Sequence, residues 1–203
     1  MARATAKSKV ITLVALLRGI NVGGKNQLPM KDLTAMFTKG GCSDVSTYIQ
    51  SGNVVFRADA DLATRIAPLI QQQIAKRFGL QVPVVLRTRD ELAVIARSNP
   101  WLTPDADLER LMVMFLANRP SSQSIATLDP GRSPPDEFLV RGQEIYLRCP
   151  NGFARTRLTN GYFDSKLATI STGRNWRTVL KLLELTGGFA KQAQVPEPTL
   201  VDP

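Results

Sequence analysis

A glycine-rich segment near the start of the chain carries the residue types best suited to binding an anion. From Arg18 to Pro29 the sequence reads RGINVGGKNQLP, and Gly19 to Lys25 fits the G-x-x-x-x-G-K spacing of phosphate-binding loops. Such loops continue with Ser or Thr, whose hydroxyl ligates magnesium, but here the next residue is Asn26. A helix beginning at Pro29 would also start too late to aim its dipole at the phosphate in the usual way. The sequence of this segment therefore does not favour ATP or GTP hydrolysis. It is a glycine-rich loop that matches only part of the phosphate-binding pattern.

The composition excludes several kinds of catalysis. The 203 residues include no histidine, which rules out Ser-His-Asp and Cys-His catalysis and histidine metal ligation. Cys42 and Cys149 lie far apart without C-x-x-C spacing, so we expect two small buried hydrophobic side chains rather than a metal site. We expect no metal and no cofactor.

The charge is basic and unevenly distributed. The net charge is +9, and residues 1–100 hold 14 Lys or Arg against 6 Asp or Glu, whereas residues 101–203 hold 12 against 11. An excess of this kind favours phosphorylated or polyanionic partners. No apolar run approaches the ~20 residues that span a bilayer. The basic start before VITLVALL lacks a cleavage signal, so we expect a cytoplasmic protein that does not enter a membrane.

The first half of the chain has the pattern β-α-β-β-α-β. Residues 10–17 form a strand that is apolar at nearly every position, which predicts cover on both faces. A helix after Pro29 is followed by VSTYIQ and NVVFRA, two strands joined at Ser51-Gly52. A helix over residues 61–78 is interrupted by Pro68, which predicts a kink or a broken first turn. Pro83 places the closing strand at a sheet edge, as in ferredoxin-like folds.

The second half repeats this pattern approximately. LMVMFLA is a second all-apolar strand, two strands join at Gly142, and helices are predicted near residues 158–167 and 175–185. The sequence therefore predicts an α+β protein with two ferredoxin-like (split β-α-β) subdomains related by approximate duplication. The predicted parts are a flexible basic tail (1–9), a first subdomain (10–88), a second subdomain with extra helices (89–186) and a loose tail (187–203).

The predicted topology brings the glycine loop to the Ser51-Gly52 hairpin. The first two strands of a split motif run parallel, so both loops leave the same end of the sheet. The polar groups there either form an anion pocket or brace the two loops against each other. Arg174 joins this set because Asn175 can cap the last helix and Trp176 can pack on its apolar face, whereas neither role explains the arginine. The candidate pocket residues are Arg18, Asn21, Gly23, Gly24, Lys25, Asn26, Gln50, Ser51, Asn53 and Arg174.

Three segments resemble a known family. LLRGINVGGKN, TYIQSGNVVF and a late RNW that opens a Leu-rich helix resemble domain-of-unknown-function family 1697, a family of bacterial proteins, over about residues 10–186. The resemblance implies two ferredoxin-like subdomains and supplies no biochemical activity. The family usually has T-T-R-N-W where this chain has Gly173 as the second residue.

Three functions are compatible with the sequence. The leading hypothesis is a metal-free anion-binding domain for a phosphorylated small molecule or a nucleic-acid backbone. An enzyme would use Lys25, with a pKa lowered by burial or by Arg18, because no histidine is present. In a protein-interaction module, the glycine loop would contact a partner. We expect a monomer because the two halves can cover each other's apolar strands.

Overall fold

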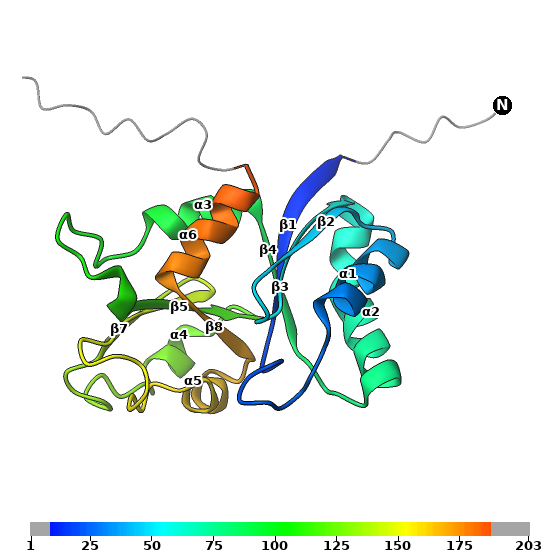
Figure 1. Ribbon diagram of the computed structural model, residues 1–203. Coiled ribbons are helices and arrows are strands. Elements are labelled where there is room, and N and C mark those ends of the chain that lie inside the picture. The colour runs from blue at the N-terminus through cyan, green and yellow to red at the C-terminus, as the bar shows by residue number, and fades with distance from the viewer. Residues whose placement is uncertain (1–8, 188–203) are drawn as a thin grey trace, which may run out of the picture.

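Two four-stranded antiparallel sheets organise the chain (Figure 1). The structure, a computed structural model, describes residues 9–187. The predicted tails therefore fall outside the described residues, except for Lys9 and Gly187. No helix in the described part is long and apolar enough to cross a membrane.

The first sheet has the strand order β2-β3-β1-β4. Its central strand β1 pairs antiparallel with β3 and β4, so β1 and β2 run in the same direction. Helices α1 and α2 cover the outer face of this sheet (Figure 1). The elements are β1 (Val10–Leu17), α1 (Met30–Lys39), β2 (Ser43–Tyr48), β3 (Asn53–Asp59), α2 (Ala60–Phe78) and β4 (Val84–Thr88).

The second sheet has the order β6-β7-β5-β8, so the strands of the two sheets follow the same relative order. Helix α3 connects the sheets, and α6 follows the last strand. The elements are α3 (Arg89–Arg97), the 3-10 turn η1 (Leu108–Arg110), β5 (Leu111–Leu116), α4 (Ser122–Ile125), β6 (Glu137–Arg141), β7 (Glu144–Arg148), α5 (Asn160–Leu167), β8 (Ser171–Asn175) and α6 (Trp176–Leu185).

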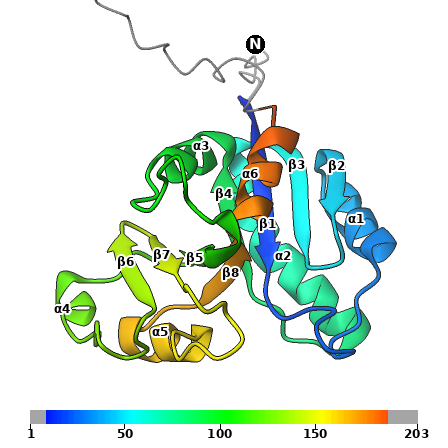
Figure 2. The same ribbon diagram turned by 60° about the vertical axis from the view of Figure 1, so that its left-hand side comes forward.

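The apolar strand β1 is covered on both faces, as its sequence predicts. Alternate side chains of a strand point to opposite faces. Leu13 and Leu17 belong to a cluster with α1 and α2, whereas Val14 and Leu16 belong to a central cluster with Phe115 of β5. Helices α3 and α6 contribute to this central cluster, and Figure 2 shows α6 close to β1. Burial of both halves in one cluster fixes their relative position.

Several local signals correspond to the observed element boundaries. The Thr88 hydroxyl accepts a hydrogen bond from the Glu91 amide (3.2 Å), and the Glu91 carboxylate accepts one from the Thr88 amide (2.7 Å), which forms a capping box. The Asn175 side chain caps α6 by accepting a bond from the Thr178 amide (2.8 Å). β4 lies at a sheet edge directly after Pro83, as predicted. Of the kink or broken first turn predicted at Pro68, the break is absent, since α2 continues through that residue.

Strand β8 is absent from the sequence prediction, which placed only helices after residue 158. Its sequence, STGRN, lacks the alternation of apolar and polar residues that identifies a half-buried strand. Ser171, Thr172 and Arg174 are nevertheless buried, and their side chains form hydrogen bonds. The pairing of β8 with β5 places Arg174 opposite Val113. This strand is what carries Arg174 into the interior of the protein.

Candidate functional site

The glycine loop and the β2–β3 loop lie against each other at one end of the first sheet. The Leu17 amide donates to the Gly52 carbonyl (2.8 Å), and Asn21 Nδ2 donates to the Gln50 carbonyl (2.9 Å). These contacts follow from the parallel direction of β1 and β2, which brings both loops to the same sheet edge.

Two asparagines hold the glycine loop in shape. Asn21 Nδ2 also donates to the Leu28 carbonyl (2.9 Å), and Asn21 Oδ1 accepts from the Leu28 amide (2.8 Å). Asn26 Nδ2 donates to the Gly19 carbonyl (2.8 Å). Both asparagines have positive φ, +55° and +51°, a conformation that Asn adopts more readily than most residues. Asn21 and Asn26 therefore act as braces.

The tip of the glycine loop is exposed. Gly23 and Gly24 have φ of +57° and +74°, and the Lys25 amide closes the turn by donating to the Val22 carbonyl (3.1 Å). The Lys25 side chain is exposed and forms no ion pair with any residue between 9 and 187. Gln50 is also exposed and contributes its carbonyl to the contact with Asn21.

Arg174 lies buried between the two sheets, with 8% of its surface exposed. Nε donates to Asn53 Oδ1 (2.5 Å), and Nη1 donates to the Thr172 hydroxyl (2.9 Å) and to the Gly173 carbonyl (2.8 Å). Nη2 donates to the Leu17 carbonyl (2.7 Å). Weaker contacts from Nη2 reach the carbonyls of Ser51 (3.2 Å) and Gly52 (3.3 Å).

Each of these acceptors is neutral. Within residues 9–187 no carboxylate forms an ion pair with Arg174. Burial lowers the pKa of its guanidinium to about 10, so the group stays charged at neutral pH. The arginine is therefore a buried positive charge that is hydrogen-bonded but not compensated by a neighbouring negative charge.

A pocket of about 360 Å³ lies beside this arginine. Arg18 also lines it; its guanidinium forms an ion pair with Asp164 of α5 and is about a third exposed. The start of α6 contributes Asn175 and Thr178 to the lining, and the N-terminal end of a helix dipole favours an anion, although the Thr178 amide is already bonded to the Asn175 side chain. We call this space the Arg174 pocket; its lining is Leu17, Arg18, Gly19, Ile20, Val22, Ile49, Ser51, Asn160, Thr172, Gly173, Arg174, Asn175 and Thr178.

Three of the ten candidate residues, Arg18, Ser51 and Arg174, line this pocket. Asn53 is fully buried and holds Arg174 from behind. The other lining residues from the second half, such as Asn160 and Thr172, were not predicted. Their position depends on β8 and α5, and the sequence gives no signal for β8.

A second buried arginine, Arg87 on β4, has the equivalent place in the other half. Arg87 lies opposite Val14 of β1, as Arg174 lies opposite Val113 of β5. Its Nη2 donates to the carbonyls of Leu116 (2.9 Å) and Gln143 (3.1 Å), at the end of β5 and in the β6–β7 turn. Each arginine thus reaches from the fourth strand of one sheet to the first strand and hairpin of the other.

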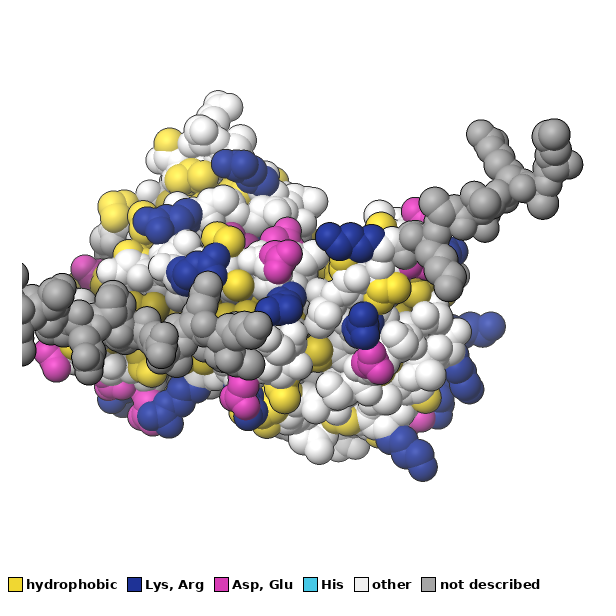
Figure 3. All heavy atoms as spheres, turned by 90° about the horizontal axis from the view of Figure 1, so that it is seen from above, with side chains coloured by type: hydrophobic (Ala, Val, Ile, Leu, Met, Phe, Trp, Pro, Cys, Tyr) yellow, Lys and Arg dark blue, Asp and Glu magenta, His cyan; other side chains and the backbone are white. Residues whose placement is uncertain are grey.

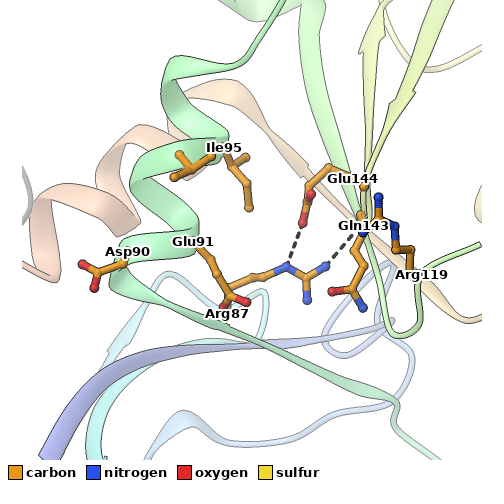
Figure 4. Close-up of a pocket in the computed structure, with 9 residues that line it drawn as sticks. Arg87, Asp90, Glu91, Ile95, Arg119, Gln143 and Glu144 are labelled. Carbon is orange, nitrogen blue, oxygen red and sulfur yellow. Dashed lines mark hydrogen bonds and ion pairs between the residues drawn. The ribbon is translucent and has the colours of Figure 1, made fainter.

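The partner of Nε distinguishes the two arginines. Arg87 Nε donates to the carboxylate of Glu144 (2.9 Å), whereas Arg174 Nε donates to the amide oxygen of Asn53. Figure 4 shows Arg87 directed toward Glu144 and Gln143 in a pocket of about 390 Å³, with Asp90 and Arg119 near its edges. The Arg87 pocket therefore contains a compensated cation.

Among residues 9–187, the other titratable groups form no metal-binding cluster and include no activated thiol. Within residues 9–187 no group of three or more His, Cys, Asp or Glu side chains can hold a metal ion. Cys42 and Cys149 are buried, and burial raises the pKa of each thiol to about 11. Both are therefore neutral thiols, as the sequence indicates, rather than nucleophiles.

Comparisons with known proteins identify the family. The model of a family described as a protein of unknown function (DUF1697) matches residues 10–146, so the chain belongs to this family. The match ends before the RNW motif at residues 174–176. Among curated proteins there is no match.

A solved structure shares the fold. The conserved bacterial protein SP0830 from Streptococcus pneumoniae aligns with a TM-score of 0.69 and 19% sequence identity, covering 88% of this chain and 99% of that one. At this identity the likeness establishes the fold and no activity.

Proposed function

We propose that this protein is a metal-free anion-binding domain whose ligand, a phosphorylated small molecule, sits in the Arg174 pocket. The observation that carries the proposal is the charge of Arg174, which is buried among neutral acceptors and lines the pocket. A cation without a compensating carboxylate attracts an anion strongly where water is scarce. The N-terminal end of α6 adds favourable potential on the same side, whereas the charge of Arg18 is shared with Asp164.

The proposed site is narrower than the sequence prediction. It retains Arg18, Ser51 and Arg174, adds Thr172 and Asn160, and assigns Asn21, Asn26 and Asn53 to its supporting walls. Lys25 is exposed at the loop tip, so no observation favours an enzyme that uses it with Arg18.

A small ligand is favoured over a nucleic-acid backbone. Long polyanions bind to continuous stripes of Lys and Arg. On the face shown in Figure 3, basic side chains are interspersed with acidic and uncharged ones on both halves. Arg174, a buried cation that lacks an acidic partner within residues 9–187, lies instead beside a pocket of limited volume.

We also infer that residues 10–88 and 89–186 are ferredoxin-like subdomains that arose by duplication. The equal strand order of the two sheets and the equivalent positions of Arg87 and Arg174 support this inference. The shared central cluster supports a monomer, because each half covers apolar strands of the other. A cytoplasmic location remains a prediction.

Titration calorimetry with inorganic phosphate and ribose 5-phosphate tests the proposed function. We expect binding by the wild-type protein that is unchanged between magnesium and EDTA, and no binding of unphosphorylated ribose. Arg174→Met should weaken binding by about ten- to a hundredfold, because the attraction of the buried charge is lost. Arg57→Met, at an exposed arginine of β3, is the control and should bind normally.

Equal heats for ribose and ribose 5-phosphate, or no binding of either phosphate compound, would contradict the proposal. Circular dichroism of Arg174→Met separates loss of the site from loss of the fold. Tighter binding of a single-stranded oligonucleotide than of ribose 5-phosphate would assign the pocket to a nucleic-acid backbone instead.

A further inference from the structure

The mouth of the Arg174 pocket is apolar. Val22 of the glycine loop and Ile49 of the β2–β3 loop line the pocket, although 64% and 51% of their surfaces are exposed. Neither belongs to one of the hydrophobic clusters of the described residues. Two loops from different parts of the first sheet thus hold β-branched side chains at the opening of a pocket that contains a buried cation.

Ile49 occupies a backbone position that disfavours it. Its φ is +49°, in the left-handed region where a β-branched residue is rare. Asn21 and Asn26, at similar φ in the adjoining loop, have the residue type that suits this conformation. An isoleucine that is exposed, outside the core and in an unfavourable conformation does not serve the fold. Strain of this kind persists mainly at ligand-binding sites.

The polar side chains of the pocket lining suit a ligand that has hydroxyl groups between an anionic end and an apolar end. The side-chain hydroxyls of Ser51 and Thr178 form no hydrogen bond within residues 9–187, and the Asn160 side chain uses its amide nitrogen to bond Ser171 (2.8 Å). The Asn160 amide oxygen therefore remains an acceptor for a ligand hydroxyl. The pocket combines a cationic interior, uncommitted polar groups and an apolar mouth.

We propose that the ligand is a nucleoside monophosphate. Its phosphate would lie beside Arg174 and Arg18, its ribose hydroxyls near the uncommitted polar groups, and its base against Val22 and Ile49. A volume of about 360 Å³ falls within the range of small-molecule sites, roughly 300–1,000 Å³. This inference rests on the proposed function and specifies the class of the phosphorylated ligand.

Calorimetric titration of the full chain with AMP, UMP and ribose 5-phosphate tests the inference. We expect both nucleotides to bind about tenfold more tightly than ribose 5-phosphate, because the base buries apolar surface of the mouth. Ile49→Asn should remove this advantage and leave the affinity for ribose 5-phosphate unchanged. Since Asn suits φ of +49°, the variant should unfold at the same temperature as the wild type or higher.

Leu139→Asn provides the matched control, because Leu139 is an exposed apolar residue of β6 outside the pocket. It should change neither affinity. If ribose 5-phosphate binds as tightly as AMP and UMP, or if Ile49→Asn retains the nucleotide preference, the inference is overturned while the proposed function stands. If no phosphate compound binds, both fail.

Discussion

Arg87 and Arg174 occupy equivalent positions in the two halves, but within residues 9–187 only Arg87 has a carboxylate partner. Each guanidinium donates to the end of a central strand and to a hairpin of the opposite half. At Nε, Glu144 accepts from Arg87 and Asn53 accepts from Arg174. The two halves therefore make the same kind of arginine contact, but the residue that accepts from Nε is charged in one half and neutral in the other.

This difference separates a structural role from a binding role. A buried cation paired with a carboxylate is electrostatically satisfied and has little to offer an anion. A buried cation among neutral dipoles keeps its charge and raises the potential of the space beside it. We therefore assign Arg87 to the joining of the halves, and Arg174 to both joining and anion attraction.

The largest expected effect is a loss of folding stability when Arg87 is replaced. Arg87→Ala would leave Glu144, whose side chain is only 14% exposed, without its partner and the Leu116 carbonyl without its donor. Breaking such a buried pair costs about 3–5 kcal/mol of unfolding free energy, measurable by urea denaturation. Arg57→Ala removes an exposed pair and should cost about 0–1 kcal/mol. A loss of similar size in both variants would contradict the role given to Arg87.

A smaller loss of stability is expected when Glu144, the carboxylate partner of Arg87, is replaced by a neutral residue. Glu144→Gln keeps an acceptor near Arg87 but removes the charge, which should cost about 1–2 kcal/mol in the same urea experiment. Glu137→Gln, at the exposed pair with Arg148, is the matched control and should lie within about 1 kcal/mol of the wild type. Phosphate affinity at the Arg174 pocket should be unaffected, and its loss would show that the two pockets are coupled.

The smallest effect is expected at Lys25, the cation of the glycine loop. Its side chain is exposed and does not line the Arg174 pocket. Lys25→Ala should change unfolding free energy by no more than about 0.5 kcal/mol, as is usual for surface substitutions. Its affinity for ribose 5-phosphate should fall less than about 2.3-fold, which corresponds to the same energy. A tenfold loss would instead place Lys25 in the binding site.

The sequence predicts the fold better than the site. Long apolar runs such as Val10–Leu17 and the signals at Thr88 and Asn175 follow from local patterns, and the structure contains the elements that they indicate. Strand β8 has no such pattern, because its buried positions are polar and are satisfied by contacts with distant segments. The apolar mouth at Ile49 likewise depends on a backbone conformation that its residue type does not favour.

The residues of the site were therefore only partly identifiable. Arg18 and Ser51 were found because they adjoin a recognisable glycine loop and hairpin. Arg174 was found because helix capping could not explain it. Its role depends on Asn53, a residue 121 positions away whose counterpart in the other half is Glu144. This charge difference becomes visible only when the strand registers are compared.

The affinity of Asn53→Asp for inorganic phosphate tests the central claim most directly. The substitution preserves the shape of the side chain and places a carboxylate at Arg174 Nε, so that Arg174 acquires the partner type of Arg87. It also removes the Nδ2 donor to the Tyr48 carbonyl (3.2 Å), a loss that the new ion pair should largely offset. We predict a folded protein of nearly wild-type stability whose phosphate affinity falls at least about tenfold. Wild-type phosphate affinity in the folded Asn53→Asp protein would contradict the claim that the uncompensated charge of Arg174 attracts the anion.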